Sequence, residues 1–350
     1  MKLVKYGIFA SVFVCALIVA PVVGFAKSEY LLTVVDVSSG QNAEVLDVVA
    51  QVREAFEEHP SVQQRELHRM LDAGANDDHY GNVESAKKSF RDGSVAFDRG
   101  RYDEALANLE NTSFFLKSSF GFVKSPGLFI DNLLYLAASQ LEVANHGALA
   151  TDDEVTVEDA TATIETLLIK FPKLIYATQR FSPEFNQLLE KVRARVSRLG
   201  TGDLRIETED GSSASAYVNG TYRGVTPLTA FGLTEGEHFV RIIAQGRSVG
   251  QAIVQVEKNR KTDISIPLQG ARNGKVLNEL IGRLREDLQR TEGAPEHVHE
   301  LKGLLHTDYV VLVQGTPAAY GTEVHAGLFN LMSGARIRST RVVFGRGGPR

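Results

Sequence analysis

Cysteine is almost absent from this sequence. One residue, Cys15, is present among 350, and it lies within an apolar run near the N-terminus. A lipoprotein signal needs small residues just before the modified cysteine, and Phe13 and Val14 stand there instead. We therefore expect no lipid anchor at Cys15. The rest of the chain has no thiol, which excludes disulfide bonds and cysteine ligands for a metal. A protein of this length must then be held together by its hydrophobic cores, and it is long enough for more than one.

Tryptophan is absent too, and neither sign of charge dominates. The chain has 38 Lys and Arg against 43 Asp and Glu, a net charge of −5. So small a charge argues against a nucleic-acid-binding protein, which would carry a basic surface. A chain without tryptophan also lacks the usual aromatic platform for a polysaccharide ligand. Beyond the N-terminal run, no apolar stretch is long enough to cross a membrane.

The first 26 residues have the pattern of a secretory signal peptide. Lys2 and Lys5 precede an apolar run over residues 8–23, and Gly24 and Ala26 place small residues at the −3 and −1 positions of a cleavage site. The alternative is an uncleaved anchor, although the run is shorter than the roughly 20 residues that span a bilayer. In either case we expect export to the periplasm or cell envelope. Membrane contact would then be limited to this segment, if it is not cleaved.

Residues 27–71 predict a small α/β segment. Residues 30–35 are rich in β-forming side chains. Apolar residues then recur on one face of a helix, at Val45, Val49, Val52 and Phe56. Residues 72–82 are polar and contain glycine, so we predict a loop there. The segment is too short to be a domain alone.

From residue 83 to residue 199 the pattern becomes helical, and its best-marked part resembles one tetratricopeptide repeat. The positions that carry this resemblance are Gly93, Ala96, Gly100, Tyr102, Ala105 and Leu109. Small residues at this spacing let two helices pack closely. The downstream proline of the repeat is missing, and Thr112 stands where alanine is usual. Because one unit cannot bury its faces alone, we expect the helical patterns at residues 128–144 and 157–171 to complete the stack.

After Gly202 the hydrophobic period changes from helical to alternating, which marks the clearest domain boundary in the chain. The last helix before it begins at Ser182, an N-cap residue that is followed by Pro183 at the first helical position. Beyond the boundary, short alternating runs predict closely spaced strands. Asn219 and Gly220 predict a tight hairpin, because both residues tolerate positive φ.

The block from Gly202 to Leu268 resembles a PEGA domain. The residues that carry the resemblance are Gly202-x-Leu204-x-Ile206, Ala214-x-Ala216-Tyr217-Val218-Asn219-Gly220, Gly224-x-Thr226-Pro227-Leu228, and Leu233, Gly236, His238 and Val240. The tetrapeptide that names the family is replaced by Gly211-Ser212-Ser213-Ala214, which retains its alanine alone. The resemblance implies a small β-sandwich of a kind found mostly in bacterial and archaeal envelope proteins, without catalytic activity.

Residues 275–345 predict a C-terminal α/β segment. An amphipathic helix with Leu277, Leu284 and Leu288 precedes a buried strand at residues 309–313 and a hairpin at residues 324–344. The sequence leaves open whether the two terminal segments form one domain. The predicted fold is therefore multidomain α+β: a helical repeat-like region (83–199), a small all-β PEGA-like sandwich (202–268) and this C-terminal segment.

Two sequence motifs suggest chemistry but lack the context that the chemistry requires. Gly246-Arg247-Ser248-Val249-Gly250 matches the G-x-S-x-G pattern of hydrolases, which needs a strand, a sharp turn and a helix. Strands are predicted on both sides of Ser248, so we expect a hairpin loop. Gly270 to Lys275 is similar to a phosphate-binding loop, but three residues separate its glycines and Val276 follows the lysine. We expect a linker there.

Histidines and acidic residues offer weak metal-site candidates. His297, His299 and His306 are the one histidine cluster, and a metal site would need carboxylates converging on them. The acidic runs Glu57-Glu58 and Asp152-Asp153-Glu154 lack the alternating ligand spacing of a calcium loop. We interpret all of them as surface residues, and we assign no catalytic, cofactor-binding or metal-binding residue.

These observations together predict an exported, non-catalytic envelope protein that acts as a protein-interaction or scaffolding module. We expect other envelope proteins, and no nucleic acid, as its partners. The alternative is a ligand-binding receptor or an enzyme whose site lies in paired terminal α/β segments.

Overall fold

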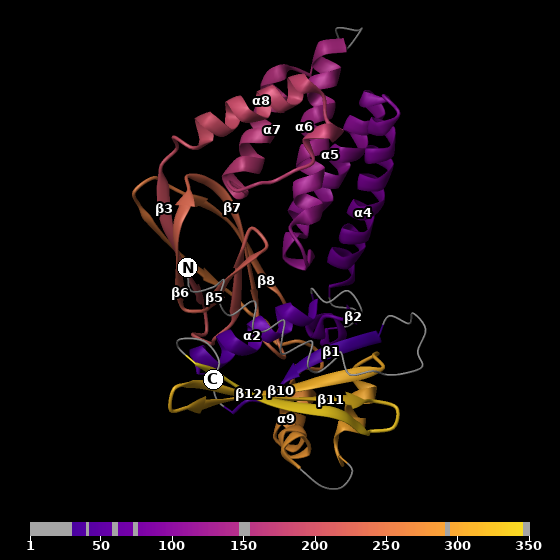
Figure 1. The fold of residues 1–350 in the computed structure, drawn as a ribbon, viewed down its shortest axis with the longest axis vertical. Helices are drawn as coiled ribbons and strands as arrows, with labels where there is room; N and C mark the ends of the chain where they lie inside the picture. The colour runs from indigo at the N-terminus through magenta and orange to yellow at the C-terminus, as the bar shows by residue number, and fades with distance from the viewer. Residues whose placement is uncertain are drawn as a thin grey trace.

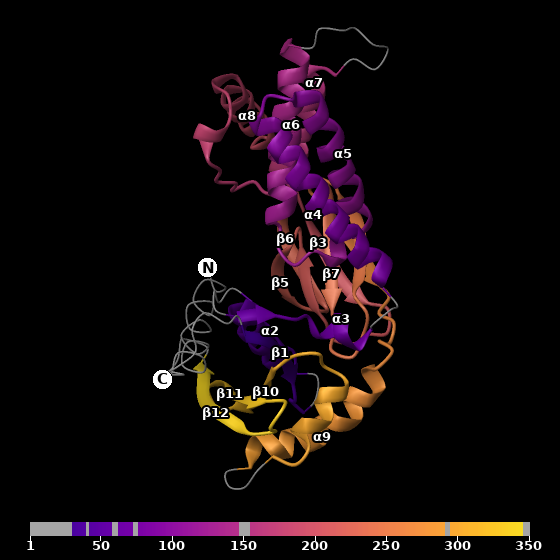
Figure 2. The same cartoon turned by 90° about the vertical axis from the view of Figure 1, so that its right-hand side faces the viewer.

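The computed structural model describes residues 30–39, 42–57, 62–72, 76–146, 155–290 and 295–345. The predicted signal peptide, Cys15 and the acidic residues Glu58 and Asp152–Glu154 lie outside these residues. The described chain is mixed α+β. Its parts follow one another along the longest axis: helices at one end, a β-sandwich in the middle and α/β layers at the other end (Figures 1 and 2).

The α/β part, called the base domain below, is built from residues 30–72 and 274–345. Its sheet has the strand order β12-β11-β10-β1-β2. Strand β1 (Tyr30–Asp36) is parallel to both β2 (Val62–Gln64) and β10 (Tyr309–Ala318), and its Val34 is aligned with Val311. The antiparallel strands β11 (Gly321–Asn330) and β12 (Arg336–Gly345) complete the sheet. The two terminal segments of the described chain therefore share one sheet.

Helices cover both faces of this sheet. Helix α2 (Ala43–Glu57) packs Val45, Val49 and Val52 against one face, so the predicted helical face is correct at these positions. On the other face lie α3 (Leu67–Leu71), α9 (Gly274–Gln289) and the 3-10 helix η3 (Val298–Gly303). Because β10 is covered on both faces, its residues Val310–Val313 are all buried, as is typical of a central strand.

The helical part, called the helical layer below, is a stack in which each helix packs against the next one in the sequence. Its helices are α4 (Asp77–Asp98), α5 (Tyr102–Ser118), α6 (Gly127–His146), α7 (Val157–Lys170) and α8 (Pro183–Val196). Gly100 makes the α4–α5 turn with φ of +71°, a conformation that glycine adopts without strain. Helix α8 begins as predicted, since the Ser182 side chain accepts a hydrogen bond from the backbone N–H of Phe185.

The predicted loop at residues 72–82 is wrong in its second half, because α4 already begins at Asp77. Asp77 and Asp78 in its first turn favour a helix start, since negative charge there interacts well with the helix dipole. The segment is polar because its residues lie largely on the exposed side of the helix. Polarity alone does not distinguish such a face from a loop.

The sandwich consists of two sheets, with strand orders β6-β3-β9 and β5-β4-β7-β8. Its strands are β3 (Thr201–Thr208), β4 (Ser215–Val218), β5 (Thr221–Val225), β6 (Leu228–Thr234), β7 (Gly236–Ile243), β8 (Gly250–Val256) and β9 (Lys261–Ile266). Alternate residues fill the core between the sheets, among them Leu204, Val218 and Ile242. Asn219 and Gly220 have φ of 51° and 75°, so the predicted β4–β5 hairpin is confirmed.

The close contact of α4 with α5 depends on Gly93. A Cβ atom at this position would lie 2.9 Å from Cγ of the buried Leu109. We predict that Gly93→Val lowers the free energy of unfolding by about 1–3 kcal/mol, because overpacking forces neighbouring side chains to move. Gly81→Val is the matched control, since Gly81 lies in the same helix and a Cβ atom added there would have open space within 4 Å. Urea denaturation compares the two variants, and an equal loss at both positions would contradict the packing argument.

Candidate functional site

The base domain contacts the sandwich through hydrogen bonds that side chains of the sandwich form. The Gln245 amide follows β7 and forms two hydrogen bonds with the Asp36 backbone: the Asp36 N–H donates to Oε1 (2.8 Å), and Nε2 donates to the Asp36 carbonyl (2.7 Å). Nearby, the Ser248 hydroxyl donates to Oδ2 of the buried Asp72 over 2.6 Å. These contacts join the end of β1 and the end of α3 to the sandwich.

A buried ion pair lies where the base domain, the helical layer and the sandwich meet. Arg241, on β7, donates from Nη2 to Oε1 of Glu66 in the base domain (3.0 Å) and from Nη1 to the carbonyl of Val123 in the helical layer (3.2 Å). Nε2 of His68 lies 3.5 Å from Oε2 of Glu66. Arg241, Glu66 and His68 are each less than 10% exposed. One guanidinium group therefore joins three parts of the fold.

Burial has opposite consequences for the two titratable neighbours of Arg241. Burial by itself raises the pKa of Glu66, but the adjacent His68 and Arg241 bring this pKa below its usual value. Burial lowers the pKa of His68 to about 4, against the attraction of Glu66. His68 is thus neutral at neutral pH, and it contributes to the lowered pKa of Glu66 only at the acidic pH where the two groups titrate together; at neutral pH the buried positive charge beside Glu66 is that of Arg241.

The depressed pKa of His68 makes stability depend on pH. Between the ordinary pKa of 6.5 and the folded value of about 4, the unfolded chain takes up a proton that the folded chain does not. Stability is therefore full above pH 6.5 and falls as the pH decreases toward 4, by at most about 3 kcal/mol from this residue. We predict that His68→Gln flattens the dependence in this window, measured by urea denaturation at several pH values. His238, whose pKa is also lowered by burial, leaves part of the slope in the variant. An unchanged slope would contradict this assignment.

Removal of one partner from the buried pair leaves the other charge uncompensated. We predict that Arg241→Met lowers the free energy of unfolding by about 3–5 kcal/mol, and that the double variant with Glu66→Leu recovers part of this loss. Arg260→Met is the matched control, because its ion pair with Glu257 is exposed and such pairs contribute about 0–1 kcal/mol. Urea denaturation measures the free energy of unfolding of all three variants. A single-variant loss no larger than that of the control would refute the central position of Arg241.

The helical layer contacts the sandwich through a second polar group. The buried Lys170, at the end of α7, donates from Nζ to the Glu237 carbonyl (2.9 Å) and lies 3.3 Å from Oε1 of the same residue. Burial lowers the pKa of this lysine, and Glu237 opposes that effect. The Asn219 side chain of the predicted hairpin donates to the Lys170 carbonyl over 3.2 Å. The hairpin turn is therefore also an anchoring point for α7.

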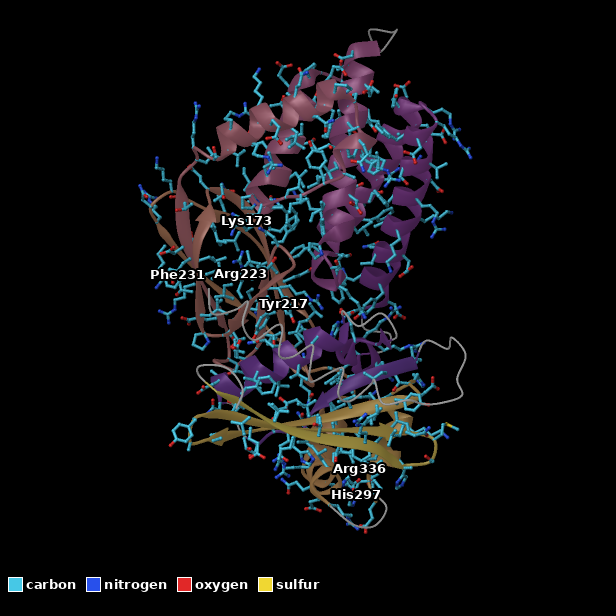
Figure 3. The ribbon with its side chains drawn as sticks, in the orientation of Figure 1. Lys173, Tyr217, Arg223, Phe231, His297 and Arg336 are labelled. Atoms are coloured by element: carbon cyan, nitrogen blue, oxygen red, sulfur yellow. The ribbon has the colours of Figure 1, made fainter. Side chains whose placement is uncertain are left out.

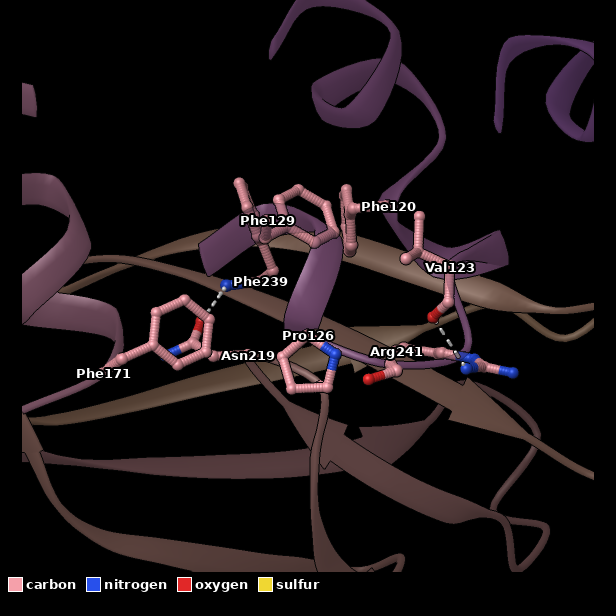
Figure 4. Close-up of a pocket in the computed structure, with 10 residues that line it drawn as sticks. Phe120, Val123, Pro126, Phe129, Phe171, Asn219, Phe239 and Arg241 are labelled. Atoms are coloured by element: carbon pink, nitrogen blue, oxygen red, sulfur yellow. Dashed lines mark hydrogen bonds between the residues drawn. The ribbon is translucent and has the colours of Figure 1, made fainter. Parts of the chain in front are cut away.

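A small aromatic pocket lies beside this contact (Figure 4). Phe120 and Phe129 of the helical layer pack against Phe239 of the sandwich, and the rings of Phe120 and Phe239 stack with centroids 4.7 Å apart. Phe171 lines the pocket beside Asn219. The enclosed space is about 20 Å³. This is room for about one water molecule, so the pocket has no space for a metabolite in this conformation.

Ser248 lies in a loop between two strands, as predicted. It lies between β7 and β8, with strands on both sides, and Gly246 has φ of +75°. Its hydroxyl contacts the carboxylate of Asp72, and no helix begins at the loop. Residues 270–275 connect the sandwich to α9, which begins at Gly274.

The histidine candidates lie on the α9 side of the base domain. Nδ1 of His297 is 3.4 Å from Oδ1 of Asp287, a buried carboxylate that also accepts hydrogen bonds from the backbone N–H groups of Glu296 and Val298. His297 and Arg336 lie at the end of the molecule away from the helical layer (Figure 3). Within the described ranges, no three His, Cys, Asp or Glu side chains are grouped so that they could hold a metal ion.

Sequence reasoning missed Glu66, His68 and Arg241. Arg241 lies between Val240 and Ile242 on β7, and a charged residue beside a core position is ordinarily expected to face solvent. Here the outer face of the sheet is covered by other modules. An arginine within the apolar stretch Phe239–Ile243 was the available signal, and it carries no information about its partner.

Two packed sheets joined through tight hairpins define a small β-sandwich module. Residues 201–272 match the family model of the PEGA domain. The predicted resemblance over residues 202–268 is thus confirmed, and this module is a PEGA domain. A search of curated proteins found no significant match for the chain. No helix within the described ranges is both long and apolar enough to span a membrane.

Proposed function

We propose that this chain is an exported, non-catalytic protein of the bacterial cell envelope that acts as a protein-interaction or scaffolding module. The supporting observation is where its buried polar side chains point. The buried Glu66 and Arg241 bond to each other across a module boundary, as do the buried Asp72 and the half-buried Ser248. Of these four residues Arg241 alone lines the small aromatic pocket. Perturbed pKa values arise in structural ion-pair networks as well as in active sites, and this geometry favours a structural role.

The proposal also draws on the elongated arrangement of the modules. The PEGA domain lies between the base domain and part of the helical layer, and polar contacts join it to both (Figure 1). These internal contacts would hold the surfaces at the two ends of the molecule at a fixed distance from each other. The tetratricopeptide-like character of the helical layer, proposed from the α4–α5 pattern, would supply one of these protein-binding surfaces.

The rival function is a receptor or an enzyme with its site in the base domain. One observation favours this rival function: the two terminal segments share one sheet. The buried Asp287 is already used by backbone N–H groups and by His297. Turnover of a small molecule that Asp287→Asn abolishes, with folding intact, would support the rival.

Crosslinking within cells tests the proposed function. A photo-reactive amino acid replaces one of three exposed residues: Phe114 on α5, Ile175 between α7 and α8, or Phe231 on β6. Figure 3 labels Phe231 at the outer side of the sandwich. We expect the chain in the envelope fraction and a discrete adduct with another protein from at least one position. The buried Leu116, two residues from Phe114 on the same helix, is the matched control and should give no adduct. Recovery of the chain in the cytoplasm, or no adduct from any position, would count against the proposal.

A further inference from the structure

The β4–β5 hairpin and the start of β7 lie against two ends of the helical layer. A Cβ atom added to Gly220 of the hairpin turn would lie 3.1 Å from Cβ of Pro126, which precedes α6. A Cβ atom added to Gly236, the first residue of β7, would lie 2.9 Å from Cγ2 of Ile169 on α7. The sandwich therefore approaches the helical layer closely here, and the polar groups of this junction hold the end of α7.

Two backbone partners fix the orientation of the Asn219 side chain. Its Oδ1 accepts a hydrogen bond from the N–H of Phe239 (2.9 Å), and its Nδ2 donates to the carbonyl of Lys170 (3.2 Å). A backbone N–H can only donate and a carbonyl can only accept, so a reversed amide would lose both bonds. Nδ2 also lies 2.8 Å from Nδ1 of His238. The amide therefore presents an N–H group to this ring nitrogen.

The same contacts determine which nitrogen of His238 carries a hydrogen. Nε2 lies 2.7 Å from the carbonyl of Thr234. Because a carbonyl only accepts, Nε2 carries the hydrogen of the neutral ring, and Nδ1 is the bare nitrogen that accepts from Asn219. The residue is 1% exposed. A proton added to Nδ1 would face the N–H group of Asn219 and would break this hydrogen bond.

Charged groups from three elements act on the His238 ring. Lys170 of α7 and Arg223 of β5 disfavour a positive charge on it, whereas Glu237 of β7 favours one. Burial is the largest influence and lowers the pKa of His238; the Thr234 carbonyl and the Glu237 carboxylate oppose this effect, and the two cations add to it. The charged ring is therefore disfavoured while α7 is docked, and a ring released into water regains the ordinary pKa of about 6.5.

We propose that protonation of His238 releases the end of α7 from the β4–β5 hairpin, so that this contact between the helical layer and the PEGA domain depends on pH. The Asn219 amide has to turn away from the charged ring, and in turning it loses its bond to the Lys170 carbonyl. The small aromatic pocket, which Asn219 also lines, then opens to solvent. Gln251 on β8 binds the backbone N–H of Gly121 independently of the hairpin, so the release is local.

The release has a defined direction with pH. Between the ordinary pKa of 6.5 and the lowered pKa of the docked ring, the released state takes up a proton that the docked state does not. Docking is therefore strongest above pH 6.5. The released fraction rises by up to about tenfold for each pH unit below this value, until the docked ring is itself protonated. Burial also lowers the pKa of His68, but that histidine lies beside Glu66 of the base domain and takes no part in this contact.

Hydrogen exchange of the native full chain tests the proposal, because it detects local openings that are rare. The reporter is the backbone N–H of Phe239, whose acceptor is the Asn219 side chain. After correction for the intrinsic effect of pH on exchange, we expect its protection to fall by up to about tenfold for each pH unit below 6.5. His238→Gln removes the titrating group and should abolish this dependence. His68→Gln is the matched control and should retain it.

A second variant keeps the test decisive where His238→Gln does not fold. Lys170→Met removes one cation that acts on the ring and keeps the backbone carbonyl that Asn219 binds, so we expect a weaker pH dependence at Phe239. An unchanged dependence in either variant would overturn the proposal. Equal protection of Phe239 and of the amides of the central strand β10 at every pH would also overturn it, because the contact would then open only when the whole chain unfolds.

Discussion

The contact between Arg241 and Glu66 is the constraint on which the arrangement of the modules depends. Its partners come from the sandwich and the base domain, and the second donor of the same guanidinium reaches the Val123 carbonyl of the helical layer. A charge buried at such a position is costly unless each of its polar partners is present. The three parts can therefore bury this surface together only in one mutual orientation. The neutral state of His68 follows from the same burial, because a second cation beside Arg241 would be unfavourable.

The topology explains why this junction needs strong internal contacts. Strand β1 belongs to the first described residues and β10 to the last segment, yet they are adjacent and parallel in one sheet. The helical layer and the PEGA domain are thus inserted into the base domain between these strands. Both ends of the insertion leave from one side of the sheet, next to α3 and α9. Contacts such as those of Gln245 with Asp36 and Ser248 with Asp72 fasten the insertion where it leaves.

Local chemistry made some elements predictable. Ser182 and Pro183 mark the start of α8, because helix capping depends only on residues that are adjacent in the sequence. Asn219 and Gly220 mark a hairpin, because the positive φ values of its turn require specific residue types. The alternating pattern after Gly202 shows where the sandwich begins, and the family match confirms it. The start of α4 was not predictable in the same way, because the polar residues from Asp77 resemble a loop when the helix face that they form is unknown.

The sequence by itself determined the modules: a helical region, a PEGA domain and α/β segments, each set by a periodicity or by a turn within a few residues. The tertiary structure alone decided that the two terminal segments share a sheet and that Arg241 meets Glu66. The reason is physical. Hydrophobic periodicity and turn chemistry act between residues that are near neighbours in the sequence. Strand partners and buried ion pairs join residues as distant in the sequence as Glu66 and Arg241. The sequence around a strand or an arginine does not specify its partner, because any other apolar strand or carboxylate would suit it equally well.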